Sequence, residues 1–249
     1  VLIGVAVWLS IVQVLPGLWP TSSLYRRFVD GWGWLELIAV LGVGTWLQHR
    51  LQRDGSAPWR RTLGVEHLLL GWYAVLQGGL QLYGLAGHDI ARHAAWTPLA
   101  LIVLPTLTAW WLARRLLASR WPPAAHPQAW RRGLLLPWLA LLALWCWVVD
   151  VLRDGSMQPL PYVPLLNPID LGHVLALLFA LQLARARLVP TRPLLIGAAA
   201  FGFVWLSSLL VRTLHHAAGT PMWLDGALDN GLVQTGLTIL WTALALLAM

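Results

Sequence analysis

Long apolar runs dominate the chain, and each is bounded by arginine, proline or a glycine-rich polar stretch. Their lengths are close to the roughly 20 residues that a helix needs to cross the ~30 Å hydrocarbon core of a bilayer. They lack the polar–apolar alternation of a membrane-spanning strand. The pattern therefore predicts an all-α, polytopic transmembrane helical bundle of about eight spans, at residues 1–18, 32–48, 63–86, 96–112, 133–152, 169–184, 193–211 and 228–249.

The composition agrees with this pattern. Of the 249 residues, 58% are hydrophobic and 11% are charged, whereas a soluble domain carries about 25% charged residues. These values exclude a soluble globule and a disordered chain, and a single cysteine excludes a disulfide scaffold. We expect one integral membrane domain over residues 1–249. Because the sequence starts and stops inside apolar runs, we also expect it to be a segment of a longer protein.

The arginines predict the orientation of the bundle. All 17 basic residues are arginine, and 12 of them fall in the loops after the second, fourth and sixth spans. The positive-inside rule makes these loops cytoplasmic and predicts that both ends face the cytoplasm, in a bacterial inner membrane. The net charge of +7 therefore indicates topology rather than nucleic-acid binding. The lipid bilayer is the expected partner, and other membrane subunits are further candidates.

Most candidate catalytic and binding residues lie on the opposite, periplasmic side. Five of the eight histidines and seven of the ten acids lie in its loops or at the adjoining helix ends. Such a mixture of His, Asp, Arg and Asn is what catalysis or polar recognition requires. The sequence thus predicts a periplasmic site built from four clusters, which are Arg26, Arg27 and Asp30; His88, Asp89, Arg92 and His93; Asp150, Arg153, Asn167, Asp170 and His173; and Arg212, His215 and His216.

We assign provisional roles within these clusters. His215 or His173 is the candidate general acid or base, Asp170 its orienting carboxylate, and Arg212 an anchor for phosphate or another anion. The other candidate substrate-binding residues are His216, Asn167, His88, Asp89, Arg92, His93, Asp150 and Arg153.

Each cluster also has an ordinary structural explanation. Asn167 and Asp170 suit the N-terminus of a helix, as cap and first-turn acid. Asp89 and Arg92 suit an exposed ion pair. The Arg212 cluster is harder to explain in this way, because ionisable groups at a helix end in the membrane are costly unless paired or used.

Metal and cofactor chemistry find no support in the sequence. The adjacent His215 and His216 cannot both face one ion from a regular helix. No HExxH or CxxC motif occurs, nor a P-loop, a nucleophile elbow or a dinucleotide-binding fingerprint. We therefore expect no metal and no cofactor.

Three segments carry a resemblance to a known family. They are Leu160-Pro-Tyr-Val-Pro-Leu-Leu-Asn-Pro-Ile-Asp-Leu171, Arg212-Thr-Leu-His-His-Ala-Ala-Gly-Thr-Pro221 and Val233-Gln-Thr-Gly-Leu-Thr-Ile-Leu-Trp241. They resemble the C-terminal part of the large bacterial inner-membrane proteins grouped as domain of unknown function 2339, and the likeness is best from about residue 150 onward. It implies a fold and a location, but not a reaction.

Three functions follow as hypotheses. The first is a cell-envelope protein that binds or modifies a lipid-linked or glycan substrate at the periplasmic site. The second is a transporter or flippase with proton-coupled polar residues, in which Glu36, Glu66 and the same site are the coupling groups. The third is a structural or assembly subunit without chemistry. A closed pocket with His–Asp contacts favours the first, and a polar path from Glu36 to Glu66 favours the second.

Overall fold

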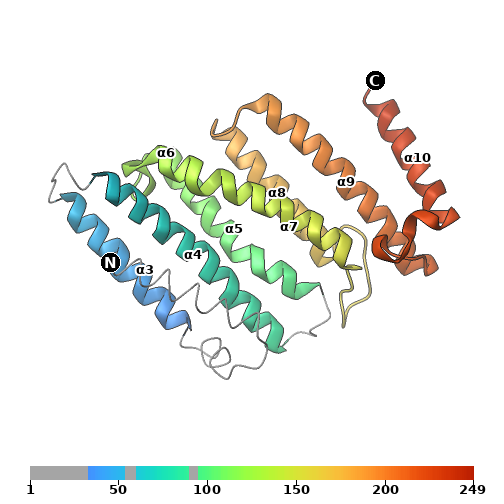
Figure 1. Cartoon of the computed structure of the whole chain (residues 1–249), viewed down its shortest axis with the longest axis horizontal. Helices are drawn as coiled ribbons and strands as arrows, with labels where there is room; N and C mark the ends of the chain where they lie inside the picture. The colour runs from blue at the N-terminus through green and yellow to red at the C-terminus, as the bar shows by residue number, and fades with distance from the viewer. Residues whose placement is uncertain (1–32, 54–59, 90–94) are drawn as a thin grey trace. The chain divides into compact units, whose positions relative to one another are not determined.

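The computed structural model describes residues 33–53, 60–89 and 95–249 (Figure 1). Every regular element in these ranges is a helix, and they contain no strand. The all-helical fold expected from the apolar pattern is therefore confirmed. The chain divides into two compact units, Val1–Asp89 with Ala100–Leu139 and Ile90–Leu99 with Ala140–Met249.

The first unit contains a helical hairpin. Gly44 of α3 (Gly33–Arg53) faces Leu70 of α4 (Arg60–Asp89), because a Cβ atom at Gly44 would lie 3.0 Å from a methyl group of Leu70. About two turns further along α3, the Gln52 amide donates a hydrogen bond to Nε2 of His67 at 2.8 Å. The elements of this unit are α3 (Gly33–Arg53), α4 (Arg60–Asp89), most of α5 (Trp96–Leu117), η3 (Pro123–Ala125), α6 (Pro127–Trp130), the π-helical turn η4 (Arg131–Leu135) and the start of α7 (Leu136–Leu152).

The second unit contains the rest of α7, followed by α8 (Pro168–Arg185), α9 (Thr191–Ala218), the short 3-10 turns η5 (Trp223–Asp225) and η6 (Ala227–Asp229), and α10 (Gly231–Leu247). Local chemistry sets the helix ends. Asn167 caps α8, with Pro168 in the first turn, and Asn230 caps α10. Gly219 ends α9 with φ +66°, a left-handed conformation that glycine adopts without strain.

Four helices of the described residues are long and apolar enough to cross a membrane, namely Trp96–Leu117, Pro127–Leu152, Pro168–Arg185 and Thr191–Ala218. The helix Gly231–Leu247 is apolar but shorter. The protein is therefore a multi-pass membrane protein. The first expected span, 1–18, lies outside the described residues, and each of the other seven expected spans overlaps a helix.

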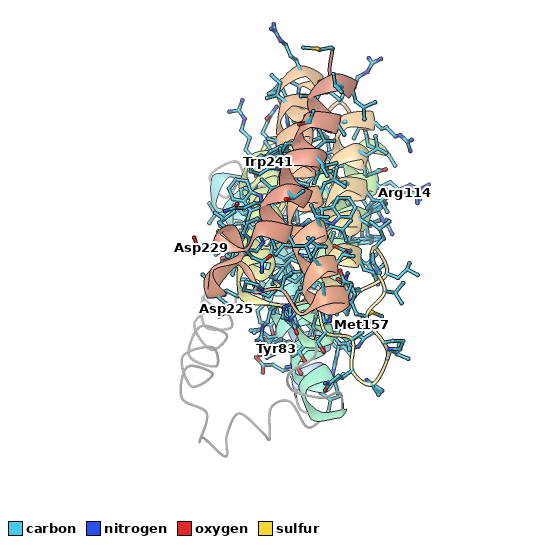
Figure 2. The ribbon with its side chains drawn as sticks, turned by 90° about the vertical axis from the view of Figure 1, so that its right-hand side faces the viewer. Tyr83, Arg114, Met157, Asp225, Asp229 and Trp241 are labelled. Atoms are coloured by element: carbon cyan, nitrogen blue, oxygen red, sulfur yellow. The ribbon has the colours of Figure 1, made fainter. Side chains whose placement is uncertain are left out.

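The last two helices pack through a small apolar core at one end and a polar contact further along. Val211 of α9 and Val233 and Leu237 of α10 are buried together with Met222 and Ala227 from the connecting segment. The indole N–H of Trp241, which Figure 2 shows partway along α10, donates to Oγ of Ser207 at 3.0 Å. These contacts hold α9 in place, and α9 carries the arginine that organises the candidate site.

Substitutions at two glycines test the packing of the first unit. A Cβ atom at Gly79 of α4 would lie 2.5 Å from the backbone oxygen of Leu101 in α5, whereas one at Gly42 of α3 meets nothing within 4 Å. We expect Gly79→Ala to cost about 1–3 kcal/mol, because the two helices must separate. Gly42→Ala is the matched control and gains up to about 1 kcal/mol in helix propensity. Unfolding in bicelles measures both; equal effects would contradict the close α4–α5 approach.

Candidate functional site

Four ionisable side chains from three helices meet inside the second unit. Asp150 lies in the last turn of α7, Asp170 lies in the first turn of α8 with His173 one turn later, and Arg212 lies near the end of α9. We call these four residues the quartet. Asp150 is 1% exposed and the other three are 0% exposed. Because a buried charge is costly unless it is paired, the contacts within the quartet decide whether the arrangement is stable.

Arg212 bridges the two carboxylates. Its Nη1 donates to Oδ1 of Asp150, and its Nη2 donates to Oδ1 of Asp170 at 2.5 Å. The guanidinium fork suits this role, because its donors are fixed in one plane and can reach two acceptors at once. Its third group, Nε, has no hydrogen-bond partner among the described residues. Both terminal nitrogens of Arg212 are thus committed to carboxylates of the protein itself.

The carboxylate of Asp170 is surrounded by donors. Oδ1 also accepts from the indole N–H of Trp205 at 2.8 Å. Oδ2 accepts from the backbone N–H of Leu165 at 3.0 Å and from the side-chain amide of Asn167. The Asn167 amide is oriented by its cap, since its Oδ1 accepts from the backbone N–H of Asp170 at 3.0 Å. Every partner of Asp170 donates, so the geometry is that of an ionised carboxylate.

His173 has an acceptor at each ring nitrogen. Nδ1 lies 2.9 Å from the backbone oxygen of Ile169, and Nε2 lies 3.0 Å from Oδ2 of Asp150. The ring stacks on Trp205 at a centroid distance of 5.3 Å and an interplanar angle of 12°, and lies 5.2 Å from the ring of Phe201. The imidazole is therefore held in one orientation between apolar ring faces, with only its edge on polar atoms.

The loop between α7 and α8 covers the quartet, and Gly155 of this loop packs closely on Arg212. A Cβ atom there would lie 3.1 Å from Cδ of Arg212 and 3.4 Å from the ring of Tyr162. Tyr162 is half-buried, and burial raises the pKa of its hydroxyl, with the side chains of Thr213 and Arg212 acting against the rise. The backbone oxygen of Ser156 accepts a hydrogen bond from the backbone N–H of Ala95 at 3.0 Å. The loop is therefore held by contacts with both Arg212 and Ala95.

The outer surface of this loop is apolar. Leu160, Val163, Leu165 and Leu166 are between 38% and 60% exposed, and three prolines lie among or beside them. Since the loop joins the ends of two membrane-spanning helices, it lies at the membrane surface. Figure 2 shows Met157 of this loop at the same end of the second unit as Asp225 and Asp229.

Substituting Gly155 tests the cover of the quartet. Gly155 has φ +78° and Gly219 has φ +66°, so alanine is strained at both positions by about 1 kcal/mol. Only Gly155 adds a contact, because nothing lies within 4 Å of a Cβ atom at Gly219. We expect Gly155→Ala to cost about 2 kcal/mol and Gly219→Ala about half of that. Unfolding in bicelles gives both values, and equal losses would mean that the loop does not press on Arg212.

The structure brings together five of the candidate residues, Asp150, Asn167, Asp170, His173 and Arg212. The rings of two other candidate residues, His215 and His216, bind backbone oxygens rather than the side chains of the quartet. His216 is exposed, stacks on Tyr162 at 4.0 Å, and donates from Nε2 to the backbone oxygen of Asp154 at 2.8 Å. His215 binds the backbone oxygen of Thr220 through Nδ1 at 2.5 Å, which leaves its Nε2 as the nitrogen with a free lone pair. Arg153 is exposed.

Several candidate residues fall on undescribed parts of the chain. The cluster of Arg26, Arg27 and Asp30 lies outside the described residues, as do Arg92 and His93. His88 and Asp89 belong to the last turn of α4, but their side chains are also outside the described part. The contribution of these residues to a site stays a prediction.

The hairpin of α3 and α4 buries a second set of polar side chains. Glu36 accepts from the Tyr73 hydroxyl at 3.4 Å, and Glu66 is half-buried near the other end of α4. The buried polar residues of the two helices are Gln48, His67, Gln77 and Gln81. Both polar atoms of Gln48 and Nδ1 of His67 lack a hydrogen-bond partner within the described residues. The hairpin therefore buries polar groups among its apolar side chains.

Sequence reasoning missed four residues that hold the quartet, Trp205, Phe201, Tyr162 and Gly155. The first two have a recognisable signal, because Phe201, Trp205, Ser208 and Arg212 recur at the spacing of one helix face. Gly155 and Tyr162 have none, because a loop contact depends on the folded path of the chain. No group of three or more His, Cys, Asp or Glu side chains in the described ranges is arranged to hold a metal ion.

Comparison with known proteins identifies the family. The family model described as "Predicted membrane protein (DUF2339)" matches residues 1–249, so the chain belongs to this family of membrane proteins over its whole length. The match extends the resemblance noted from residue 150 onward to the first half of the sequence. No curated protein and no solved structure matches this chain.

Proposed function

We propose that this chain forms the membrane part of a bacterial cell-envelope transporter or flippase that is coupled to proton movement, with the quartet as its coupling site. The observation that carries the proposal is that, within the described residues, the His173–Asp150 contact is packed inside the protein and does not line a pocket that could admit a substrate, so the criterion set for the enzyme is not met by the quartet. No terminal nitrogen of Arg212 and no ring nitrogen of His173 is free to touch a substrate. Buried ionisable groups within membrane helices are characteristic of ion pathways, because their cost is tolerated only where they are used.

Two further features support transport. The α3–α4 hairpin carries the half-buried acids Glu36 and Glu66 and buries Gln48 and His67. Ionisable groups within membrane helices are typical of proton relays. The quartet also joins three helices through polar contacts, so a change in its charge alters their packing together. We place the quartet near the periplasmic surface, as the arginine distribution predicts, and expect the cargo to be a lipid-linked or glycan precursor.

The native cysteine provides the test. Cys146 is the sole cysteine of the sequence, is 0% exposed, and lies one turn before Asp150 on α7. A transporter must expose its coupling site to each side in turn. In liposomes, we expect a membrane-impermeant maleimide to label Cys146 when a pH gradient is applied, and not at equal neutral pH. Cys146→Ala is the blank. Protection of Cys146 under every gradient until the protein unfolds would contradict transport.

A second function is supported by His215. Its Nδ1 is engaged by Thr220, and the half-exposed ring keeps Nε2 available as a base. We therefore retain an enzyme acting on a lipid-linked or glycan substrate as the alternative. Mass spectrometry of envelope lipids from cells that express the wild type or His215→Gln tests it. A lipid product that is lost in His215→Gln, with unchanged Cys146 labelling, supports the enzyme, and identical lipid profiles contradict it.

A further inference from the structure

The hydrogen bonds around His173 require one proton more than the ordinary charges of the quartet supply. The backbone oxygen of Ile169 can only accept, so Nδ1 of His173 must carry a hydrogen. A neutral imidazole has one N–H, which leaves Nε2 as a bare acceptor. Yet Nε2 faces Oδ2 of Asp150 at 3.0 Å, and an ionised carboxylate is also only an acceptor. Two acceptors at this distance repel each other unless a proton lies between them.

The charge balance of the quartet also requires one additional proton. Arg212 carries one positive charge, because its guanidinium is always protonated in proteins. Asp170 is ionised, because all of its partners donate. These two groups cancel. An ionised Asp150 with a neutral His173 would leave one uncompensated negative charge in a site that is closed to solvent. One added proton on the pair makes the quartet neutral.

We infer that the quartet binds one proton between Nε2 of His173 and Oδ2 of Asp150. The proton has two equivalent descriptions, an imidazolium beside a carboxylate or a neutral imidazole that accepts from a carboxylic acid, and both have the same total charge. Asp170 and Arg212 hold His173 and Asp150 in place and do not themselves bind this proton. That this proton is the coupling ion rests on the proposed function, whereas its presence rests on the hydrogen bonds and the charge balance of the quartet.

Among the residues that the structure describes, no further charged side chain forms an ion pair with Asp150 or His173. On α7 the nearest ionisable neighbour of Asp150 is the Cys146 thiol, one turn away. On α8 and α9 the neighbours are Asp170 and Arg212, and the covering loop contributes the Tyr162 hydroxyl. Trp205 and Phe201 cover His173 with aromatic rings. Loss of the proton would therefore leave the negative charge on Asp150 only partly balanced by Arg212, which Asp170 shares.

Spectroscopy of the protein in lipid bilayers tests the inference. Solid-state NMR of ¹⁵N-histidine protein reports the protonation of both ring nitrogens, and the difference from His173→Gln assigns the signal among the eight histidines. Infrared spectroscopy reports a protonated carboxyl group. We expect at neutral pH either a doubly protonated His173 or a protonated carboxyl group, and we expect Asp150→Asn to abolish whichever is seen. Asp225→Asn, an exposed acid of the same unit, is the control and leaves the signal unchanged.

The opposite result is equally clear. A neutral His173 together with fully ionised carboxylates in the wild type would overturn the inference, and this reading does not depend on whether the Asp150→Asn variant folds. Asp150→Glu provides a second variant that keeps the carboxylate and is expected to keep the proton. A proton found here, with Cys146 protected under every gradient, would contradict transport but leave the inference intact. The two proposals can therefore fail separately.

Discussion

Arg212→Gln is expected to lower the free energy of unfolding by about 3–5 kcal/mol, the typical cost of removing one partner from a buried ion pair. The substitution leaves the carboxylates of Asp150 and Asp170 facing each other without the guanidinium that bridges them. It also removes the side chain on which Gly155 packs. Unfolding in bicelles, followed by tryptophan fluorescence, measures the loss.

Arg192→Gln is the matched control, because Arg192 belongs to the same helix but is exposed near its start. We expect a change within about 0.5 kcal/mol there. Arg212→Lys should fall between the two, since an ammonium keeps the charge but cannot present two fixed donors in one plane. A loss at Arg212 no larger than at Arg192 would contradict the buried bridge.

Asp170→Ala gives the second large effect, a loss of about 3 kcal/mol or more. Four donors lose their acceptor at once: the guanidinium of Arg212, the indole N–H of Trp205, the backbone N–H of Leu165 and the amide of Asn167. Arg212 and Asn167 are buried, and an unpaired buried donor retains its full desolvation cost. The same unfolding assay measures the loss.

A conservative variant and a control variant provide the comparison for the loss of stability in Asp170→Ala. Asp170→Asn keeps an oxygen and the side-chain volume, so its loss is expected to be smaller than that of alanine. Asp225→Ala removes an exposed carboxylate from the segment before α10 and is expected to change stability by less than about 0.5 kcal/mol. If asparagine and alanine were equally harmful at position 170, the hydrogen bonds to the carboxylate would carry no weight beyond its charge.

The fold could be predicted from the sequence because apolar length is a local property. Expected span 169–184 corresponds to Pro168–Arg185, and the cap by Asn167 was expected from the residues Asn167-Pro168. The apolar span expected at 193–211 stops before Arg212, and the helix that contains it runs from Thr191 to Ala218. The helix continues because Arg212 finds carboxylates on two neighbouring helices rather than water.

The sequence predicted which residues could form the site, but it did not predict which of them would pair. The sequence indicated which side would hold the acids and histidines, but the ion pair of Asp150 with Arg212 joins residues 62 positions apart, and no local pattern specifies that pairing. The sequence placed His216 in one cluster with Arg212 and His215. His216 lies one turn further along α9 than Arg212, where its partners are loop residues rather than the carboxylates.

The apolar outer surface of the covering loop makes the quartet sensitive to its surroundings. Leu160, Leu165 and Leu166 are exposed in the protein, and in a bilayer they contact the region where headgroups meet acyl chains. The backbone N–H of Leu165 also binds Asp170 directly. Changes in headgroup packing are therefore expected to act on the same residue that helps to hold the quartet, so the lipid composition of the membrane affects how tightly the buried charges are closed off from solvent.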